Sequence, residues 1–352
     1  MTDELAAYDY ELPFDLIARH PAERRDDARL MVVDRTTQAI SHHGVRELPR
    51  LLRPADCLVL NDTRVVPARL LGLRVKTGGR WEGLFLELAE AGEWRLLCQS
   101  RGKLQPGEQI EIHPAHSPQS ARRLVLELVA REDGGLWRAR PTISIEPWAA
   151  LDEFGTVPLP PYMHRDLAEA DDFERYQTVY ARHRGSVAAP TAGLHFTAEL
   201  LAQCTERGIG QAFVTLHVGV GTFRPIVAEN LERHRMHGEW CAVPEETAQA
   251  LARAQAQGGR RIAVGTTSAR ALESAARSGH IEAWRGSTDL FIRPPYEFRA
   301  IDGLVTNFHL PRSTLLVLAM TFAGRELILR AYCEAIRERY RFYSYGDAML
   351  IV

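Results

Sequence analysis

A histidine followed by two glycines lies at the end of an apolar segment, residues 211–218, that we predict to be a strand. The histidine is His217, and Gly219, Gly221, Thr222 and Phe223 follow it. In α/β proteins, ligands bind beyond the carboxyl ends of the strands. An imidazole there can exchange protons near neutral pH, and glycines leave backbone N–H groups open to a substrate. The pattern therefore predicts a site of proton transfer, although the GxGxxG fingerprint of dinucleotide-binding proteins is absent.

Two further stretches place a histidine in a predicted loop. Residues 190–196 put small residues beside His195 before a predicted helix, which suits close approach of the backbone to a ligand. A tight turn with a helix cap explains that pattern equally well. A second predicted strand ends in Asn307 and His309.

The segment His234–Glu239 combines two histidines, His234 and His237, with a carboxylate. Histidines at this spacing can ligate zinc, but neither an HExxH motif nor a cysteine pair accompanies them. We favour a polar site for substrate. Buried histidines with a structural role are the alternative.

A predicted strand enters a helix through Gly265, Thr266 and Thr267, one turn before Arg270. Free N–H groups and the positive end of the helix dipole suit a carboxylate or phosphate there, although threonine is also an ordinary helix cap. Near the end of the chain, aromatic residues precede Asp347. They could stack on a base whose hydrogen bonds the carboxylate accepts, or simply pack a terminal segment.

Helices and strands alternate through the second half of the chain. Apolar periodicity predicts helices over residues 198–207, 244–257, 268–277 and 327–340, and strands over 211–218 and 261–264. This alternation predicts an α/β core with a largely parallel sheet.

Residues 65–150 differ from the rest of the sequence. Short β-prone segments separated by glycine-containing turns occupy residues 70–75, 81–88, 94–98, 109–112, 124–129 and 136–140. They predict a small antiparallel, β-barrel-like domain inserted into the core. The expected domains are a discontinuous α/β catalytic core over residues 1–64 and 151–352, and an inserted barrel-like domain over residues 65–150.

The composition excludes several classes of protein. The 352 residues carry a formal charge of −2, which excludes a global basic field for nucleic acid or membrane but allows a local patch. The five cysteines are scattered, which argues against a disulfide framework, a zinc ribbon or an iron–sulfur cluster. The longest apolar run, residues 314–323, is too short to span a bilayer, and the N-terminal segment has no apolar signal core. We expect a soluble, cytoplasmic protein.

Short motifs recur in one characteristic order along nearly the whole chain, most weakly in the insertion. They are residues 10–13, 16–18, 60–69, 158–162, 176–180, 187–196, 215–219, 265–268, 306–311 and 340–349. This ordered set resembles the S-adenosylmethionine:tRNA ribosyltransferase-isomerase family of queuosine biosynthesis. Arg184, where proline is common, and Gly238, where serine is usual, depart from the family pattern. Such changes affect tRNA contacts or local packing and leave the reaction class intact.

The resemblance implies an enzyme that transfers and isomerises the ribosyl moiety of S-adenosylmethionine. The acceptor is the aminomethyl group of 7-aminomethyl-7-deazaguanine at the wobble position of tRNA. The product is epoxyqueuosine-tRNA, and adenine and methionine are released. S-adenosylmethionine is therefore a consumed substrate, and no metal or other cofactor is expected. The expected partners are this tRNA and S-adenosylmethionine, without a membrane, and the expected state is a monomer.

The same chemistry suggests roles for the polar residues. We expect His217 and His195 to transfer protons, with Glu239 or Asp347 near the amine or the sulfonium. Thr266, Thr267 and Arg270 are expected to hold the methionine carboxylate, and Gly219, Gly221 and Phe223 to fit the adenosyl part. The remaining substrate-binding candidates are Thr222, His234, His237, Asn307 and His309, and the candidate phosphate contacts of tRNA are Arg24, Arg25, Arg29, Arg339 and Arg341.

Two other functions remain open from the sequence. A metal-dependent hydrolase would use His234, His237 and nearby acids, and would contain zinc and lose activity to chelators. A non-catalytic RNA-binding protein would bind tRNA without consuming S-adenosylmethionine.

Overall fold

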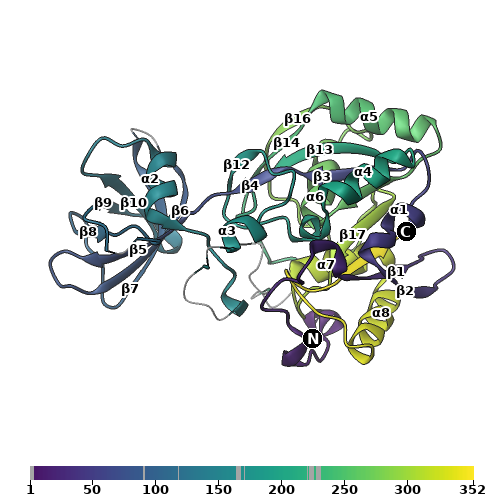
Figure 1. Cartoon of the computed structure of the whole chain (residues 1–352), viewed down its shortest axis with the longest axis horizontal. Helices are drawn as coiled ribbons and strands as arrows, with labels where there is room; N and C mark the ends of the chain where they lie inside the picture. Colours follow the sequence, from purple (N-terminus) through teal and green to yellow (C-terminus); the bar gives the residue numbers. More distant parts are fainter. Residues whose placement is uncertain are drawn as a thin grey trace. The chain divides into compact units, whose positions relative to one another are not determined.

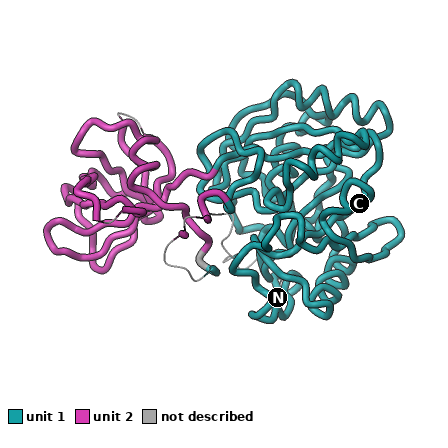
Figure 2. The backbone as a smooth tube through the Cα atoms, viewed as in Figure 1, with its two compact units in different colours: residues 1–64, 162–164, 175–352 teal, residues 65–161, 165–174 magenta. Residues whose placement is uncertain are grey.

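The chain divides into two compact units, which Figure 2 shows in different colours. One contains residues 1–64, 162–164 and 175–352, and the other residues 65–161 and 165–174. The computed structural model describes residues 4–89, 92–117, 119–163, 168–169, 171–219, 221, 226 and 231–352.

Among the described residues, the first unit is built on a nine-stranded mixed sheet (Figure 1). Four neighbouring strands in its middle are parallel: β13 (Gly210–Leu216), β3 (Cys57–Asn61), β15 (Arg261–Val264) and β17 (Gly303–Asn307). Beyond β13 lie β14 (Glu239–Val243) and β16 (Trp284–Thr288), and beyond β17 lie β18 (Ala348–Ile351), β1 (Arg29–Val33) and β2 (Ile40–Gly44). The α/β core with parallel strands is thus confirmed, and antiparallel pairs extend it on both sides.

Helices cover both faces of this sheet because the strand residues alternate between two apolar clusters. Val59 and Ala263 pack with residues of α5 (Glu245–Ala256), α6 (Thr266–Ala275), α7 (Thr314–Ala323) and α8 (Arg325–Arg337). Leu58 and Ile262 pack with α1 (Leu48–Leu51) and α4 (Ala198–Glu206). A parallel sheet needs such cover on both faces.

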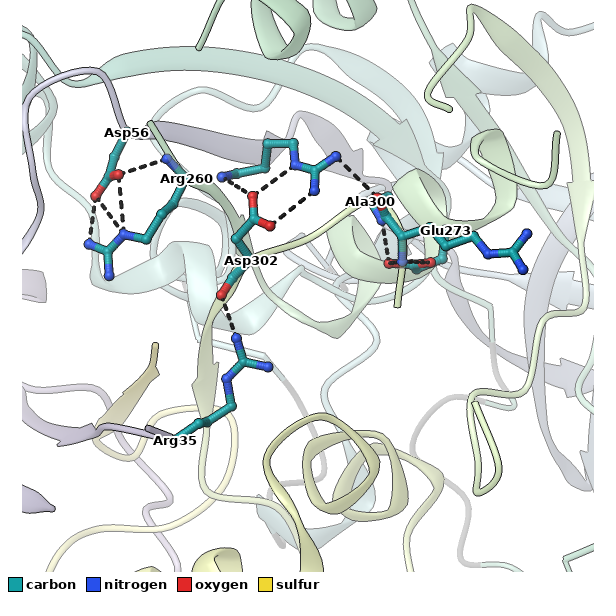
Figure 3. Close-up of polar contacts among 8 residues, drawn as sticks. Arg35, Asp56, Arg260, Glu273, Ala300 and Asp302 are labelled. Atoms are coloured by element: carbon teal, nitrogen blue, oxygen red, sulfur yellow. Dashed lines mark hydrogen bonds and ion pairs between the residues drawn. The ribbon is translucent and has the colours of Figure 1, made fainter. Parts of the chain in front are cut away.

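Ion pairs hold the amino ends of the central strands (Figure 3). Asp56, which is fully buried before β3, accepts hydrogen bonds from the backbone N–H of Arg260 at 2.8 Å and from its Nη2 at 2.7 Å. Asp302, before β17, binds the guanidinium of Arg261, and its carbonyl accepts from Arg35 Nη2 at 2.8 Å. Glu273 of α6 accepts the backbone N–H of residue 300 at 2.9 Å. Charged groups therefore fix the amino ends of the central strands. The loops at the carboxyl ends of these strands are the candidates for ligand binding.

The second unit is a closed antiparallel barrel. Its strands are, in spatial order, β5 (Arg69–Arg74), β6 (Arg80–Leu88), β7 (Trp94–Ser100), β10 (Leu136–Pro141), β9 (Leu124–Arg131) and β8 (Gln109–Ile112), and pairing of β8 with β5 closes the ring. Trp81, Phe85, Trp94 and Trp137 are buried in it. The inserted barrel is therefore confirmed.

Residue 150, the predicted end of the insertion, lies inside α2 (Pro147–Phe154). The structure assigns this helix to the barrel unit. Trp148 packs edge-on against Phe85 of the barrel with ring centroids 6.0 Å apart, and β11 (Gly155–Thr156), which follows α2, pairs with β5. The core resumes beyond these contacts.

Three short elements complete the surroundings of the site. Strands β4 (Thr63–Val65) and β12 (His183–Ser186) form a two-stranded sheet, and Thr191–His195 is a 3₁₀ helix. A short helix, α3 (Asp172–Arg175), precedes β12 in the chain. Within the described ranges, no helix combines the length and apolarity needed to cross a bilayer.

Candidate functional site

The polar residues singled out from the sequence gather at the carboxyl edge of the central sheet. Because β3, β13, β15 and β17 are parallel, the residues that follow them lie at one edge. These are Thr63, His217, Gly265 and Asn307. Strand β14 is antiparallel to β13, so its first residue, Glu239, lies at the same edge.

His217 is half-buried and held on three sides. Its Nδ1 lies 2.8 Å from Thr63 Oγ1, and its ring stacks on Trp240 with centroids 5.0 Å apart and planes at 21°. A Cβ atom at Gly185 would come within 2.7 Å of His217 Nε2, so this glycine leaves room for the ring. Burial, and to a lesser degree the charge of His183, lower the pKa of His217 to about 4. The imidazole is therefore neutral near pH 7 and able to accept a proton.

Glu239 and Arg270 form a buried ion pair beside His217. Glu239 Oε2 contacts Arg270 Nη1, and Oε1 accepts the backbone N–H of Gly219 at 2.7 Å. Arg270 Nε donates to the carbonyl of Leu290 at 2.9 Å, whereas its Nη2 is buried and has no hydrogen-bond partner among the described residues. Glu239 therefore orders the glycine loop, and Arg270 keeps one donor for a ligand.

A hollow of about 20 Å³, the size of one water molecule, lies at the N-terminus of α6. Thr267 Oγ1 is buried there without a partner in the described part of the chain. The first N–H groups of a helix also lack partners within it, so this end can receive a carboxylate. The hollow brings together four predicted residues: Thr266, Thr267, Asn307 and His309. Arg270 does not line it.

His195 is buried with both ring nitrogens engaged. Its Nε2 lies 3.2 Å from Asn307 Nδ2, and because an amide nitrogen only donates, Nε2 is the acceptor. The carbonyl of Arg25 faces the other side of the ring, and Thr191 Oγ1 donates to Asn307 Oδ1 at 2.9 Å. Burial lowers the pKa of His195 to about 4. These contacts position the loop that carries His195. Because both ring nitrogens of His195 are engaged, His217 is the more accessible base of the two.

Asp347 connects backbone segments. Its two oxygens accept the backbone N–H groups of Arg29 at 2.8 Å and Arg341 at 2.7 Å, and burial raises its pKa. The register of β17 and β18 pairs Asn307 with Ala348, so Asp347 does lie at the carboxyl edge. Both of its oxygens accept backbone N–H groups, and its place near the amine or the sulfonium stays a prediction.

The arginines expected to contact tRNA come from both ends of the chain and lie together. Arg29 Nη1 donates to the carbonyl of Glu338 at 2.7 Å, and Arg341 donates to the carbonyl of His20. A parallel bridge between Ile17 and Phe342 joins the two segments. Arg24 and Arg339 are exposed and pair with Asp26 and Asp15, and Arg25 lines a hollow with His195.

The remaining candidates lie around the glycine loop. A Cβ atom at Gly221 would approach His237 Cδ2 to 2.4 Å, so His237 lies against that glycine. His234 is half-buried, packs edge-on against Phe291 with centroids 5.3 Å apart, and has a pKa lowered by burial. The candidates at positions 222 and 223 lie outside the described residues. No three His, Cys, Asp or Glu side chains within the described ranges are placed to share a metal ion.

A family model described as queuosine biosynthesis protein matches residues 5–351. The chain belongs to this family. The resemblance seen in the sequence is thereby confirmed.

Curated relatives and a solved structure extend the comparison over the whole chain. The S-adenosylmethionine:tRNA ribosyltransferase-isomerase of Geobacter metallireducens is 50% identical over 352 residues, 98% of each chain. The protein of the same name from Thermosynechococcus vestitus is 48% identical over 99% of this chain and 96% of its own. The crystal structure of the S-adenosylmethionine tRNA ribosyltransferase of Thermotoga maritima is 38% identical, covers 98% of this chain and 100% of its own, and has a TM-score of 0.56.

Three residues of this queuosine biosynthesis protein were missed as site candidates. Asp62, Thr63 and Trp240 all lie at the carboxyl edge. A signal for the first two was present, because residues 61–63 directly follow a buried apolar run, as His217 does. Trp240 carried no such signal, since its contact with His217 depends on the pairing of β13 with β14.

Acid should destabilise the protein through its buried histidines. Burial lowers the pKa of His195 to about 4 and that of His309 to about 3, below the ordinary 6.5. In the unfolded chain these histidines bind protons at a higher pH than in the folded protein. The stability that they contribute is therefore complete above pH 6.5, and it is lost as the pH falls towards 4 for His195 and towards 3 for His309. Between pH 6.5 and 5, each should lower the free energy of unfolding by about 2 kcal/mol, which urea titrations at both pH values would measure.

The histidine contribution is isolated by comparing variants, because buried carboxyls with a raised pKa, such as Glu273, act in the opposite direction. His309→Gln should flatten the pH dependence by about 2 kcal/mol. His280→Gln, at an exposed position, should leave it unchanged. An equal pH dependence in the two variants would contradict the assignment.

Proposed function

We propose that this protein is an S-adenosylmethionine:tRNA ribosyltransferase-isomerase. It transfers the ribosyl moiety of S-adenosylmethionine to the aminomethyl group of 7-aminomethyl-7-deazaguanine at the wobble position of tRNA, and isomerises it to give epoxyqueuosine-tRNA. Adenine and methionine leave. The full-length similarity to relatives that carry this enzyme name is the observation that supports this function most strongly.

The site supports the proton transfers that this reaction needs. A base must remove a proton from the carbon beside the cationic sulfur, and His217 is neutral near pH 7 because burial lowers its pKa to about 4. The proton passes to the imidazole while the sulfonium stabilises the electron pair left on carbon. The buried ion pair of Glu239 and Arg270 orders the loop that follows His217.

The carboxylate of the methionine part is held at the N-terminus of α6. Thr267 Oγ1 and the free N–H groups of the first turn supply donors, and the helix dipole favours a negative charge there. Arg270 Nη2 is a further buried donor close to this helix end. S-adenosylmethionine is a substrate rather than a cofactor, and no metal takes part. The protein works in the cytoplasm as a monomer, where both substrates are present.

A turnover assay tests the function. The protein is mixed with S-adenosylmethionine and tRNA carrying the 7-deazaguanine amine, without added metal. Equal amounts of adenine, methionine and a nucleoside with the added ribosyl mass are expected. Binding of tRNA without release of adenine would indicate an RNA-binding protein. The absence of both tRNA binding and adenine release would overturn the proposal, and a zinc-dependent hydrolase would again have to be considered.

The arginine cluster predicts a salt-dependent tRNA affinity. Arg339→Ala should weaken binding and lower the slope of log affinity against log salt by about 1, because one phosphate contact is lost. Filter binding between 50 and 300 mM salt measures both effects. Arg299→Ala, near the opposite edge of the sheet, is the matched control, and equal slopes in both variants would remove Arg339 from the tRNA contacts.

A further inference from the structure

Three consecutive residues after β3 each hold a different part of the site. Asn61 exchanges two hydrogen bonds of 3.0 Å with the backbone of Leu216. Asp62 Oδ1 accepts from Thr215 Oγ1 at 2.7 Å, and Thr63 Oγ1 contacts His217 Nδ1 at 2.8 Å. The end of β13, including His217, is thus attached to the end of β3 by side chains.

Asp62 also faces a second imidazole. His183 Nε2 lies 3.6 Å from Asp62 Oδ2, and the backbone N–H groups of Arg182 and His183 both donate to the carbonyl of Asp62, at 2.7 and 3.2 Å. The side chain of Asp62 is 5% exposed and that of His183 is 62% exposed. The carboxylate therefore orients the ring, and the ring is the member of the pair that can touch a substrate.

The two imidazoles have different surroundings. His217 is half-buried, with a pKa lowered by burial and by the charge of His183. His183 is open to solvent and lies beside a carboxylate, an arrangement that orients an imidazole. Burial raises the pKa of Asp62, and the charge of His183 offsets part of that effect. Neighbouring groups whose environments differ in this way divide between base and acid.

We infer that His183, oriented by Asp62, is the general acid that complements His217. This assignment rests on the proposed function. The bond between the ribose and adenine breaks, its electron pair goes to the adenine nitrogen, and a proton from His183 neutralises that nitrogen. The ring oxygen of the ribose supplies electron density to the carbon that adenine leaves, and the acceptor amine then forms the new bond to this carbon and loses a proton. The reaction needs such an acid because adenine is a poor leaving group without a proton.

Other charged groups lie on the elements around His183. Arg64 follows Thr63, Arg182 and Arg184 flank the histidine on the chain, and His217 follows β13. The guanidinium of Arg182 lies 4.7 Å from the ring centroid of Phe213, so it is directed to that ring. The carboxylate of Asp62 lies beside the His183 ring, with Oδ2 3.6 Å from Nε2.

The test is single-turnover adenine release at saturating tRNA. His183→Gln should lower the rate by about 10²- to 10⁴-fold, with the KM for tRNA changed less than about three-fold, and added imidazole should restore part of the rate. His280→Gln, which replaces another exposed histidine beside a carboxylate, should behave as the unsubstituted protein.

A second variant tests whether the role of His183 depends on its contact with the Asp62 carboxylate. Asp62→Asn keeps the side-chain shape and should lower the same rate by about 10-fold or more, with a partial response to imidazole. An unchanged rate in His183→Gln, or a raised KM for tRNA at an unchanged rate, would overturn the assignment and make His183 a tRNA contact. No adenine release by the unsubstituted protein would instead overturn the proposed function, and this inference with it.

Discussion

His217→Ala should lower the rate of adenine release by about 10²- to 10⁴-fold while the protein stays folded, because it removes the neutral base of the site. The ring is half-buried and lies between Thr63 and Trp240. Single-turnover release of adenine and the thermal unfolding midpoint are the measurements. The rate should fall, and the midpoint should change by a few degrees at most.

The pH dependence gives this prediction a second readout. A base works in its unprotonated form, so kcat/KM should fall as pH drops through the pKa of His217, about 4, and should not depend on this group at neutral pH. Thr63→Val, which removes one hydrogen bond to the ring and keeps its shape, should lower the rate by about 10-fold. Turnover by His217→Ala close to that of the unsubstituted protein would exclude a catalytic role.

Glu239→Gln should lower the free energy of unfolding by about 3–5 kcal/mol. The side chains of Glu239 and Arg270 are 3% and 4% exposed, and the variant leaves the guanidinium charge buried without a carboxylate. The hydrogen bond to the N–H of Gly219 can be kept by the amide oxygen. Urea unfolding at pH 7 measures the loss.

A surface pair and a double variant test the physical cause. Glu297→Gln breaks the exposed contact with Arg299 and should change stability by less than about 0.5 kcal/mol. Combining Glu239→Gln with Arg270→Met removes the unpaired charge, so the double variant should be more stable than Glu239→Gln alone. A double variant less stable than the single one would show that packing of Arg270, rather than its charge, is what matters.

Local sequence signals predicted the barrel and much of the core. All six β-prone segments of the insertion correspond to strands, and the strand predicted over residues 261–264 has the bounds of β15. These elements depend on alternation and on turn residues close in sequence, so a short window contains the information. The helix that follows β15 begins two residues earlier than predicted, because Thr266 and Thr267 lie inside its first turn.

Other parts depend on partners far away in the chain. Strands β1, β2 and β18 were not predicted. The pairing of β1 with β18 joins opposite ends of the sequence, so no short window contains it. Within the site, His217, Thr267 and Asn307 were predicted since each follows a parallel strand. The contact of Asp62 with His183 was not, because it brings together residues separated by the whole barrel.

The position of β18 affects how the chain is assembled during translation. This strand follows all the others of its sheet in the chain, yet it lies between β17 and β1. As the polypeptide leaves the ribosome, β1 and β2 can pair with each other at once, whereas β3 and the other edge of β1 must wait for partners made much later. The barrel strands pair within one short stretch and can close early, since local pairings form fastest. The nascent chain therefore contains a finished barrel and a sheet that still lacks β18, and this strand completes the sheet when it emerges.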